Sequence, residues 1–68
     1  MGVIIIREMV GSSQDSWSEA AQNAVARASQ TVRNIRQVEV VRHTARVEND
    51  RIVEFDVELK IHFEYEGS

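Results

Sequence analysis

The sequence predicts an α+β fold in which the elements follow the order β-α-β-β and a three-stranded antiparallel sheet wraps around one helix. Three observations predict it: an apolar, β-branched run opens the chain, a helical repeat built mainly on alanine follows, and apolar and polar residues alternate near the end. With 68 residues the chain has room for a single domain, residues 1–68. A chain this short buries only about 60% of the surface that its unfolded form exposes.

The first strand is expected over residues 3–10, which are rich in β-branched side chains and end at Gly11. The polar segment GSSQDS follows as a loop. The apolar run Val3–Ile6 is too short for a membrane span or a signal-peptide core, so we expect a cytoplasmic protein with no membrane partner.

The helix is expected to begin after Ser16, because Ser16 and Glu19 have the spacing of a capping box, in which each side chain accepts a hydrogen bond from a backbone N–H. Apolar residues at helical spacing follow, namely Trp17, Ala20, Ala21, Ala24, Val25, Ala28, Val32 and Ile35. The small alanine side chains would let the backbone of a curved sheet approach closely.

After Asn34 the period changes to two, which predicts a long hairpin over residues 38–65. In its second strand, five apolar residues alternate with polar ones: Phe55, Val57, Leu59, Ile61 and Phe63 against Glu54, Asp56, Glu58, Lys60 and His62. The first strand changes its buried side near Val40 and Val41, which indicates a bulge or bend. Turn residues at positions 48–50 join the two strands.

The composition excludes several classes of protein. The chain has no cysteine, so disulfides and thiolate zinc sites are excluded, and assembly into an oligomer is the favoured way to complete the core. The net charge is −3 and the basic residues are scattered, so we expect no nucleic-acid partner.

Candidate chemistry is limited. No nucleophile has a paired base, and the histidines, His43 and His62, lack the spacing of a catalytic zinc site and are interpreted as sheet-surface residues, so no enzyme is expected. Glu54, Asp56 and Glu58 share one face of a strand. Residues two positions apart on a strand are separated by about 6.6–6.8 Å, whereas the oxygen ligands of a calcium ion each lie about 2.3–2.6 Å from it.

One copy of this acidic row could therefore hardly chelate a metal, but copies converging on a symmetry axis could. The competing interpretation is a solvated or interior-facing acidic face whose partners include Arg42, Arg46 and Lys60.

Two segments, VGSSQDSWSEAAQNAVARASQTVRNIRQVEVV and VEFDVELKIHFEYEG, resemble the dodecin family, over about residues 3–67. The likeness comprises a strand ending in a Gly-Ser-Ser turn, an alanine-rich helix, an Asn-Ile corner and a last strand ending in aromatic and acidic residues. The resemblance implies a hollow homododecamer built from trimers that binds flavins (riboflavin, FMN or FAD) at subunit interfaces for storage.

In typical members a Trp stacks on the flavin and a Gln bonds to its polar edge; these positions fall on Gln37 and Asp56 here. Gln37 removes the aromatic platform and Asp56 can only accept hydrogen bonds. A calcium-binding subgroup of the family resembles the chain around Ser16-Trp17 and Ile35-Arg36. Two hypotheses follow: a small-ligand cage with an altered flavin pocket, or a calcium-binding or purely structural cage.

Overall fold

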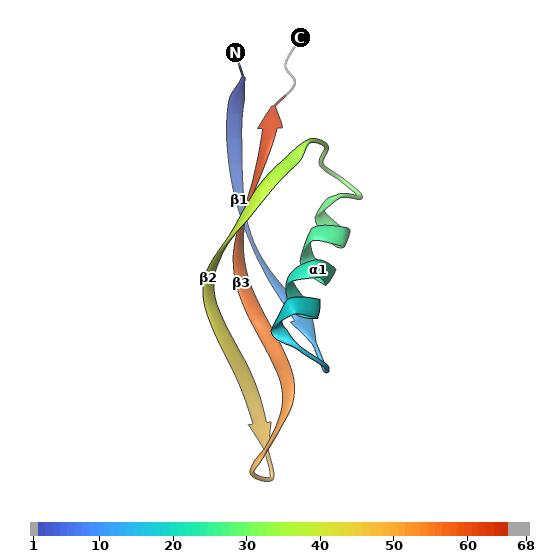
Figure 1. Ribbon diagram of the computed structural model, residues 1–68, viewed down its shortest axis with the longest axis vertical. Coiled ribbons are helices and arrows are strands. Elements are labelled where there is room, and N and C mark those ends of the chain that lie inside the picture. Colours follow the sequence, from blue (N-terminus) through green and yellow to red (C-terminus); the bar gives the residue numbers. More distant parts are fainter. Residues whose placement is uncertain (1, 66–68) are drawn as a thin grey trace.

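The computed structural model describes residues 2–65 and contains three strands and one helix in the predicted order (Figure 1). The elements are β1 (Val3–Ser13), α1 (Trp17–Ala28), β2 (Ile35–Glu48) and β3 (Arg51–Tyr65). The strands form one antiparallel sheet with the spatial order β1-β3-β2. The predicted α+β fold is confirmed.

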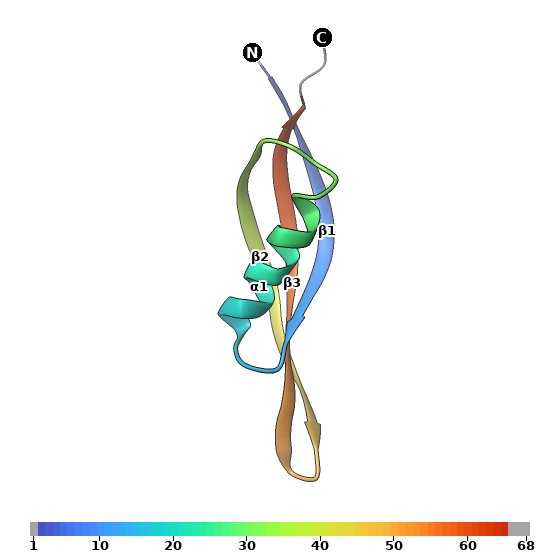
Figure 2. The same ribbon diagram turned by 90° about the vertical axis from the view of Figure 1, so that its right-hand side faces the viewer.

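The molecule is elongated, with extents of 53 × 19 × 13 Å, because the long central strand β3 sets its length. Helix α1 lies against one face of the sheet near its middle (Figures 1 and 2). The tip of the β2–β3 hairpin projects beyond one end of the helix, and the start of β1 with the end of β3 projects beyond the other. The helix therefore covers only part of the sheet.

The core lies between α1 and the middle of the sheet. Its buried side chains are Ala20, Ala24 and Ala28 from the helix and Val57, Leu59 and Ile61 from β3. The alternation in β3 thus places one set of side chains toward the helix and leaves the other set on the opposite face, which we call the outer face. The predicted alanine stripe is the buried side of the helix.

The start of α1 is capped by a wider network than the capping box predicts. The Glu19 N–H donates to Ser16 Oγ at 3.0 Å, as predicted. The Glu19 carboxylate, however, accepts from the Ser13 hydroxyl at 2.6 Å, and it is Ser13 Oγ that accepts from the N–H groups of Asp15 and Ser16. The predicted role of the Glu19 side chain is wrong because the buried Ser13 hydroxyl at the end of β1 takes its place.

The helix ends at Ala28, although the apolar spacing predicted a helix that continues toward Asn34. The N–H groups of Gln30 and Thr31 donate to the carbonyls of Arg27 and Ala28 three residues back, which tightens the last turn. Asn34 then has φ 62° and redirects the chain into β2. Val32 and Ile35 lie beyond the helix but still pack against the core, so their apolar side chains continue the helical spacing by coincidence.

Strand β2 shifts its register against β3 between Val40 and Arg42, which confirms the predicted bend, and again near each end. The hairpin loop consists of Asn49 and Asp50, which have φ 53° and 62°. Two residues with positive φ form the turn that matches the twist of antiparallel strands. The outer edges of β1 and β2 have no strand partner within residues 2–65.

Gly11 is required by the close approach of α1 to β1, and its φ is not positive. A Cβ at this position would overlap the carbonyl oxygen of Ala20 and lie 2.9 Å from the Ala24 Cβ. We predict that Gly11→Ala lowers the free energy of unfolding by at least about 2 kcal/mol, measured by urea denaturation. Gly2→Ala is the matched control, because its new Cβ meets only the flexible side chain of Glu64; equal stability of the two variants would contradict the close approach.

Candidate functional site

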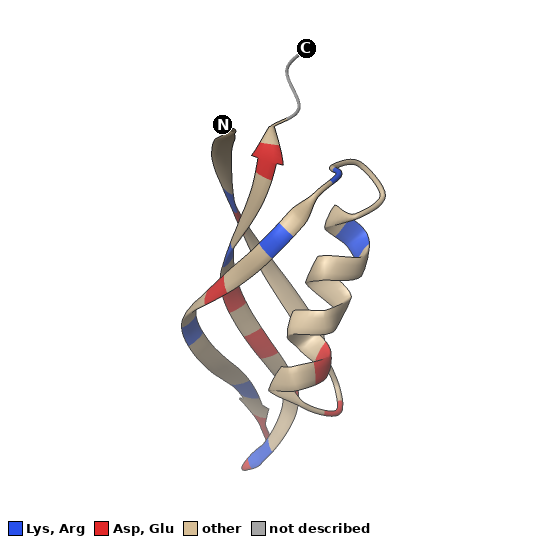
Figure 3. Cartoon of the chain, turned by 45° about the horizontal axis from the view of Figure 1, so that its top comes forward, with Lys and Arg blue, Asp and Glu red and all other residues tan. Residues whose placement is uncertain are grey.

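The outer face of the sheet carries the candidate functional residues. Acidic residues recur along β3 with positive charges on the neighbouring strand (Figure 3). The predicted metal-binding residues Glu54, Asp56 and Glu58 all lie on this face, since their neighbours in β3 point toward the helix.

Two of these three carboxylates already have partners within the chain. The Ser12 hydroxyl of β1 donates to Asp56 Oδ1 at 2.7 Å, and Arg46 Nη2 of β2 lies 2.7 Å from Glu54 Oε1. The bond from Ser12 is the main reason that the pKa of Asp56 lies below its ordinary value of 3.8, and contacts with Glu54 and Arg46 lower this pKa further. The expectation that Arg46 partners the acidic row is confirmed.

Glu58 lies between Val10 of β1 and Arg42 of β2 in the sheet. Among residues 2–65, no group of three acidic, histidine or cysteine side chains is close enough to hold a metal ion. A cation on this face would therefore need carboxylates from more than one copy of the chain.

The two predicted flavin-contacting residues are far apart within one chain. Gln37 pairs with His62 across the sheet, whereas Asp56 pairs with Ser12 and Thr44. His62 and Asp56 are separated by six positions of β3, or about 20 Å. One copy does not bring Gln37 and Asp56 together, so a site that uses both must be shared between copies.

Gln37 also borders an open groove of about 340 Å³ between β2 and the helix. Ala21, Val25 and Ile35 form the apolar part of its lining, and Gln22 and Arg36 are polar residues at its border. The Arg36 guanidinium is already engaged, since its Nη2 lies 2.8 Å from Glu64 Oε1. Gln37 is thus a polar group at the edge of an apolar surface.

His62 is more enclosed than the sequence predicts. Its side chain is only 17% exposed, and its Nε2 atom is buried without a hydrogen-bond partner, 3.8 Å from Glu39 Oε1. His62 lies on the outer face of the sheet as predicted, but its side chain is half-buried there, whereas His43 is exposed. Only the sheet register, which places His62 opposite Gln37, reveals its position.

Trp17 does not replace the missing aromatic platform. Its ring packs edge-on against Phe55, with centroids 4.8 Å apart, and against His43 at 5.8 Å. Its Nε1–H donates to the Thr44 carbonyl at 2.9 Å. Both the ring and its polar atom are committed to packing between the start of α1 and the sheet.

The outer face also exposes a row of apolar side chains on the edge strand β1. Ile4 and Ile6 are 51% and 52% exposed and Val10 is 65% exposed. An unpaired edge with an apolar row is a surface that other chains can cover. Helix α1, which is the one helix in residues 2–65, is not long and apolar enough to cross a membrane.

The chain is a small β-α-β-β domain with open sheet edges and an outer face that carries both acidic and apolar side chains. The dodecin family model matches residues 3–66, and the chain belongs to the dodecin family. A curated relative, the calcium dodecin of Mycobacterium tuberculosis, is 30% identical over 63 residues, which are 93% of this chain and 89% of the relative.

Solved structures agree with this assignment. Dodecin from Streptomyces coelicolor matches with a TM-score of 0.94 and 36% identity, covering 98% of this chain and 96% of that protein. The tt0972 protein from Thermus thermophilus matches with a TM-score of 0.94 and 29% identity over the whole of both chains. The calcium dodecin of M. tuberculosis, described as calcium chelating, matches with a TM-score of 0.83 and 29% identity, covering 97% and 94%.

The hydrogen bond from Ser12 to Asp56 predicts a pH-dependent stability. Since the folded pKa of Asp56 is lowered, its ionised form stabilises the fold above pH 3.8, and this contribution is lost as the pH falls through the lower folded value. In Ser12→Ala the pKa of Asp56 should rise toward 3.8, and the loss of stability relative to the wild-type protein should be largest at neutral pH and shrink as the pH falls below 3.8. Carboxyl carbon NMR titration and urea unfolding measure the two effects.

Thr44→Val is the matched control, because Thr44 flanks Asp56 on the other side without a side-chain bond to it. An Asp56 pKa that stays the same in Ser12→Ala would show that the hydroxyl does not hold the carboxylate.

Proposed function

We propose that the protein is a non-enzymatic subunit of a hollow homododecamer, built from trimers, that binds and stores a small ligand of the flavin type at interfaces between copies. The observation that carries this proposal is the separation of Gln37 and Asp56 by about 20 Å on one polar face. A site that used both residues would be completed only by a second copy, and family membership supports such an assembly.

The exposed apolar row of β1 supports the same conclusion on energetic grounds. Ile4, Ile6 and Val10 stand on the outer face, away from the helix, and no element within residues 2–65 covers them. Full burial of such a side chain contributes about 1.5–3 kcal/mol, and about half to two thirds of that remains to be gained at these partly exposed positions. Contact between copies would provide this burial and would turn the outer faces toward one another or toward a shared interior.

The ligand pocket is an altered one. Gln37 offers an amide plane where an aromatic ring would stack, and stacking on a ring contributes about 1–3 kcal/mol. Asp56 offers only acceptors, and one of its oxygens already accepts from Ser12. A flavin carbonyl at this position would meet a negative charge, so we propose binding that is weaker than with an aromatic and an amide, and a preference for ligands that donate to a carboxylate.

Riboflavin fluorescence tests the proposed ligand class. Titration of the purified protein should quench the emission with a dissociation constant in the micromolar range. Gln37→Trp combined with Asp56→Gln should tighten binding by at least about 100-fold, because it restores the stacked ring and the amide donor. Gln30→Trp, which adds an aromatic to an exposed turn, is the matched control. Unchanged emission with both the wild-type protein and the double variant would overturn the flavin proposal.

A calcium-binding cage is the second candidate, favoured by the likeness to a calcium dodecin and by the acidic row of Glu54, Asp56 and Glu58. Since one copy does not gather three ligands among residues 2–65, the ion would sit where several copies converge. Calorimetric titration with calcium should then release heat and raise the melting temperature, Glu58→Gln should abolish both effects, and Asp50→Asn in the hairpin loop should retain them. Absence of both in the wild-type protein would leave a purely structural cage.

A further inference from the structure

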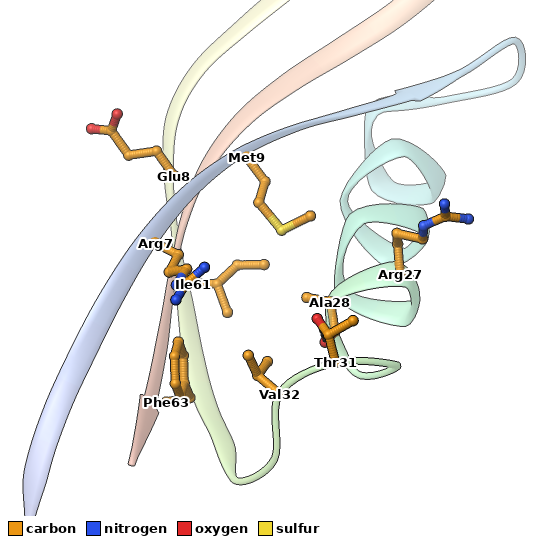
Figure 4. A pocket seen from close by; sticks show the side chains of 9 residues that line it. All are labelled: Arg7, Glu8, Met9, Arg27, Ala28, Thr31, Val32, Ile61 and Phe63. Carbon is orange, nitrogen blue, oxygen red and sulfur yellow. Dashed lines mark hydrogen bonds between the residues drawn. The ribbon is translucent and has the colours of Figure 1, made fainter. Parts of the chain in front are cut away.

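A second cavity lies on the other side of the helix from Gln37. It has a volume of about 250 Å³ and lies between β1, β3 and the C-terminal end of α1 (Figure 4). Its apolar wall consists of Met9, Val32, Ile61 and Phe63, and Arg7 and Arg27 are its cationic neighbours. None of these six residues belongs to the proposed flavin or calcium sites.

Arg7 breaks the pattern of β1 at this cavity. It pairs with Ile61, whose side chain is buried on the helix side, so Arg7 also faces the helix side of the sheet. Its neighbours on the same side of β1 are Ile5 and Met9, both half-buried. A hydrocarbon at this position would extend the core, whereas a guanidinium leaves a cavity with a positive charge beside Ile61 and Phe63 (Figure 4).

No carboxylate neutralises this charge within the described residues 2–65. None of the ion pairs closer than 4.0 Å in this part of the chain involves Arg7 or Arg27. Glu8 also borders the cavity, but its carboxylate points away from it (Figure 4). The cavity therefore combines an apolar wall with an exposed arginine that has no ion-pair partner among residues 2–65.

The carbonyl groups at the C-terminal end of α1 would not repel an anion in this cavity. The Ala28 carbonyl accepts from the N–H groups of Thr31 and Val32 and from the Thr31 hydroxyl, and the Arg27 carbonyl accepts from the Gln30 N–H. These bonds satisfy carbonyls that would otherwise present negative partial charge. Arg27 borders the cavity from the last turn of the helix. Its guanidinium points away from Ile61 and Phe63 (Figure 4), so it would face a bound anion only after a change of rotamer.

We propose that this cavity binds a small organic anion, a carboxylate or phosphate ester with a compact aryl or alkyl body. Arg7 would bind the anionic group with two parallel N–H donors, Arg27 would add charge at the opening, and the body would pack on Ile61, Phe63 and Val32. A dry cavity of about 150 Å³ holds a benzene ring, so this larger cavity accommodates one ring with its anionic group.

The methionine methyl groups give a direct probe, because the chain has only Met1 and Met9, and Met9 lines the cavity. The whole protein, labelled with carbon-13 at the methionine methyls and in its native assembly, is titrated with phenyl phosphate and, separately, with benzoate. We expect a saturable shift of the Met9 signal with at least one of them, and the stronger of the two identifies the anionic group. Benzyl alcohol and inorganic phosphate, which each lack one half of the ligand, should bind at least about tenfold more weakly.

Variants separate the charge from the cavity. Arg7→Gln should weaken binding at least about tenfold, Arg7→Lys should retain part of it, and Arg51→Gln at the hairpin end should have no effect. Absence of a saturable shift, equal binding of benzyl alcohol, or an unchanged affinity of Arg7→Gln would each overturn the proposal. A change in the oligomeric state of Arg7→Gln, measured by sedimentation, would also overturn it. Arg7 would then contribute to a contact between copies, and a second copy rather than a ligand would occupy the cavity.

Discussion

The constraint on which this structure depends is the mismatch in length between its single helix and its sheet. The helix has 12 residues, or about 18 Å, whereas β3 has 15 residues, or about 50 Å. The helix covers the middle of one face, and the ends of the sheet, its outer face and both edges are left open. The apolar side chains of β1 on that face have no partner element among residues 2–65, and this open surface is the basis of the assembly that we propose.

Small residues line the contact between the short helix and the sheet. Gly11 and the stripe of Ala20, Ala24 and Ala28 allow the helix axis to lie close to β1 and β3, so a few buried side chains of β3 form a dense core. The sheet bends around this contact at the register shifts of β2. The outer face is then free to carry the polar residues, from Ser12 and Asp56 in the middle to Gln37 and His62 toward one end, and the flavin-type or calcium site that we propose lies on that face.

The sequence predicts the elements and the buried faces because hydrophobic periodicity determines both. The alternation around Leu59, the alanine stripe and the bend near Val40 were all predictable from the sequence and are present in the structure. The helix end was not, because Val32 packs on the core from an irregular segment that happens to continue the helical spacing. Partners across the sheet were also beyond the sequence: the bond from Ser12 to Asp56, the position of His62 opposite Gln37 and the inward direction of Arg7 all depend on register, which no local pattern fixes.

Sedimentation velocity across a range of protein concentrations tests the central claim most directly, since the account requires copies of the chain to cover one another. The account predicts a single sharp species near twelve times the chain mass of 7.8 kDa, and its loss in Ile6→Lys, which places a charge in the exposed apolar row of β1. A folded, cooperatively melting monomer of 7.8 kDa at all concentrations would contradict the shared sites and the cage together.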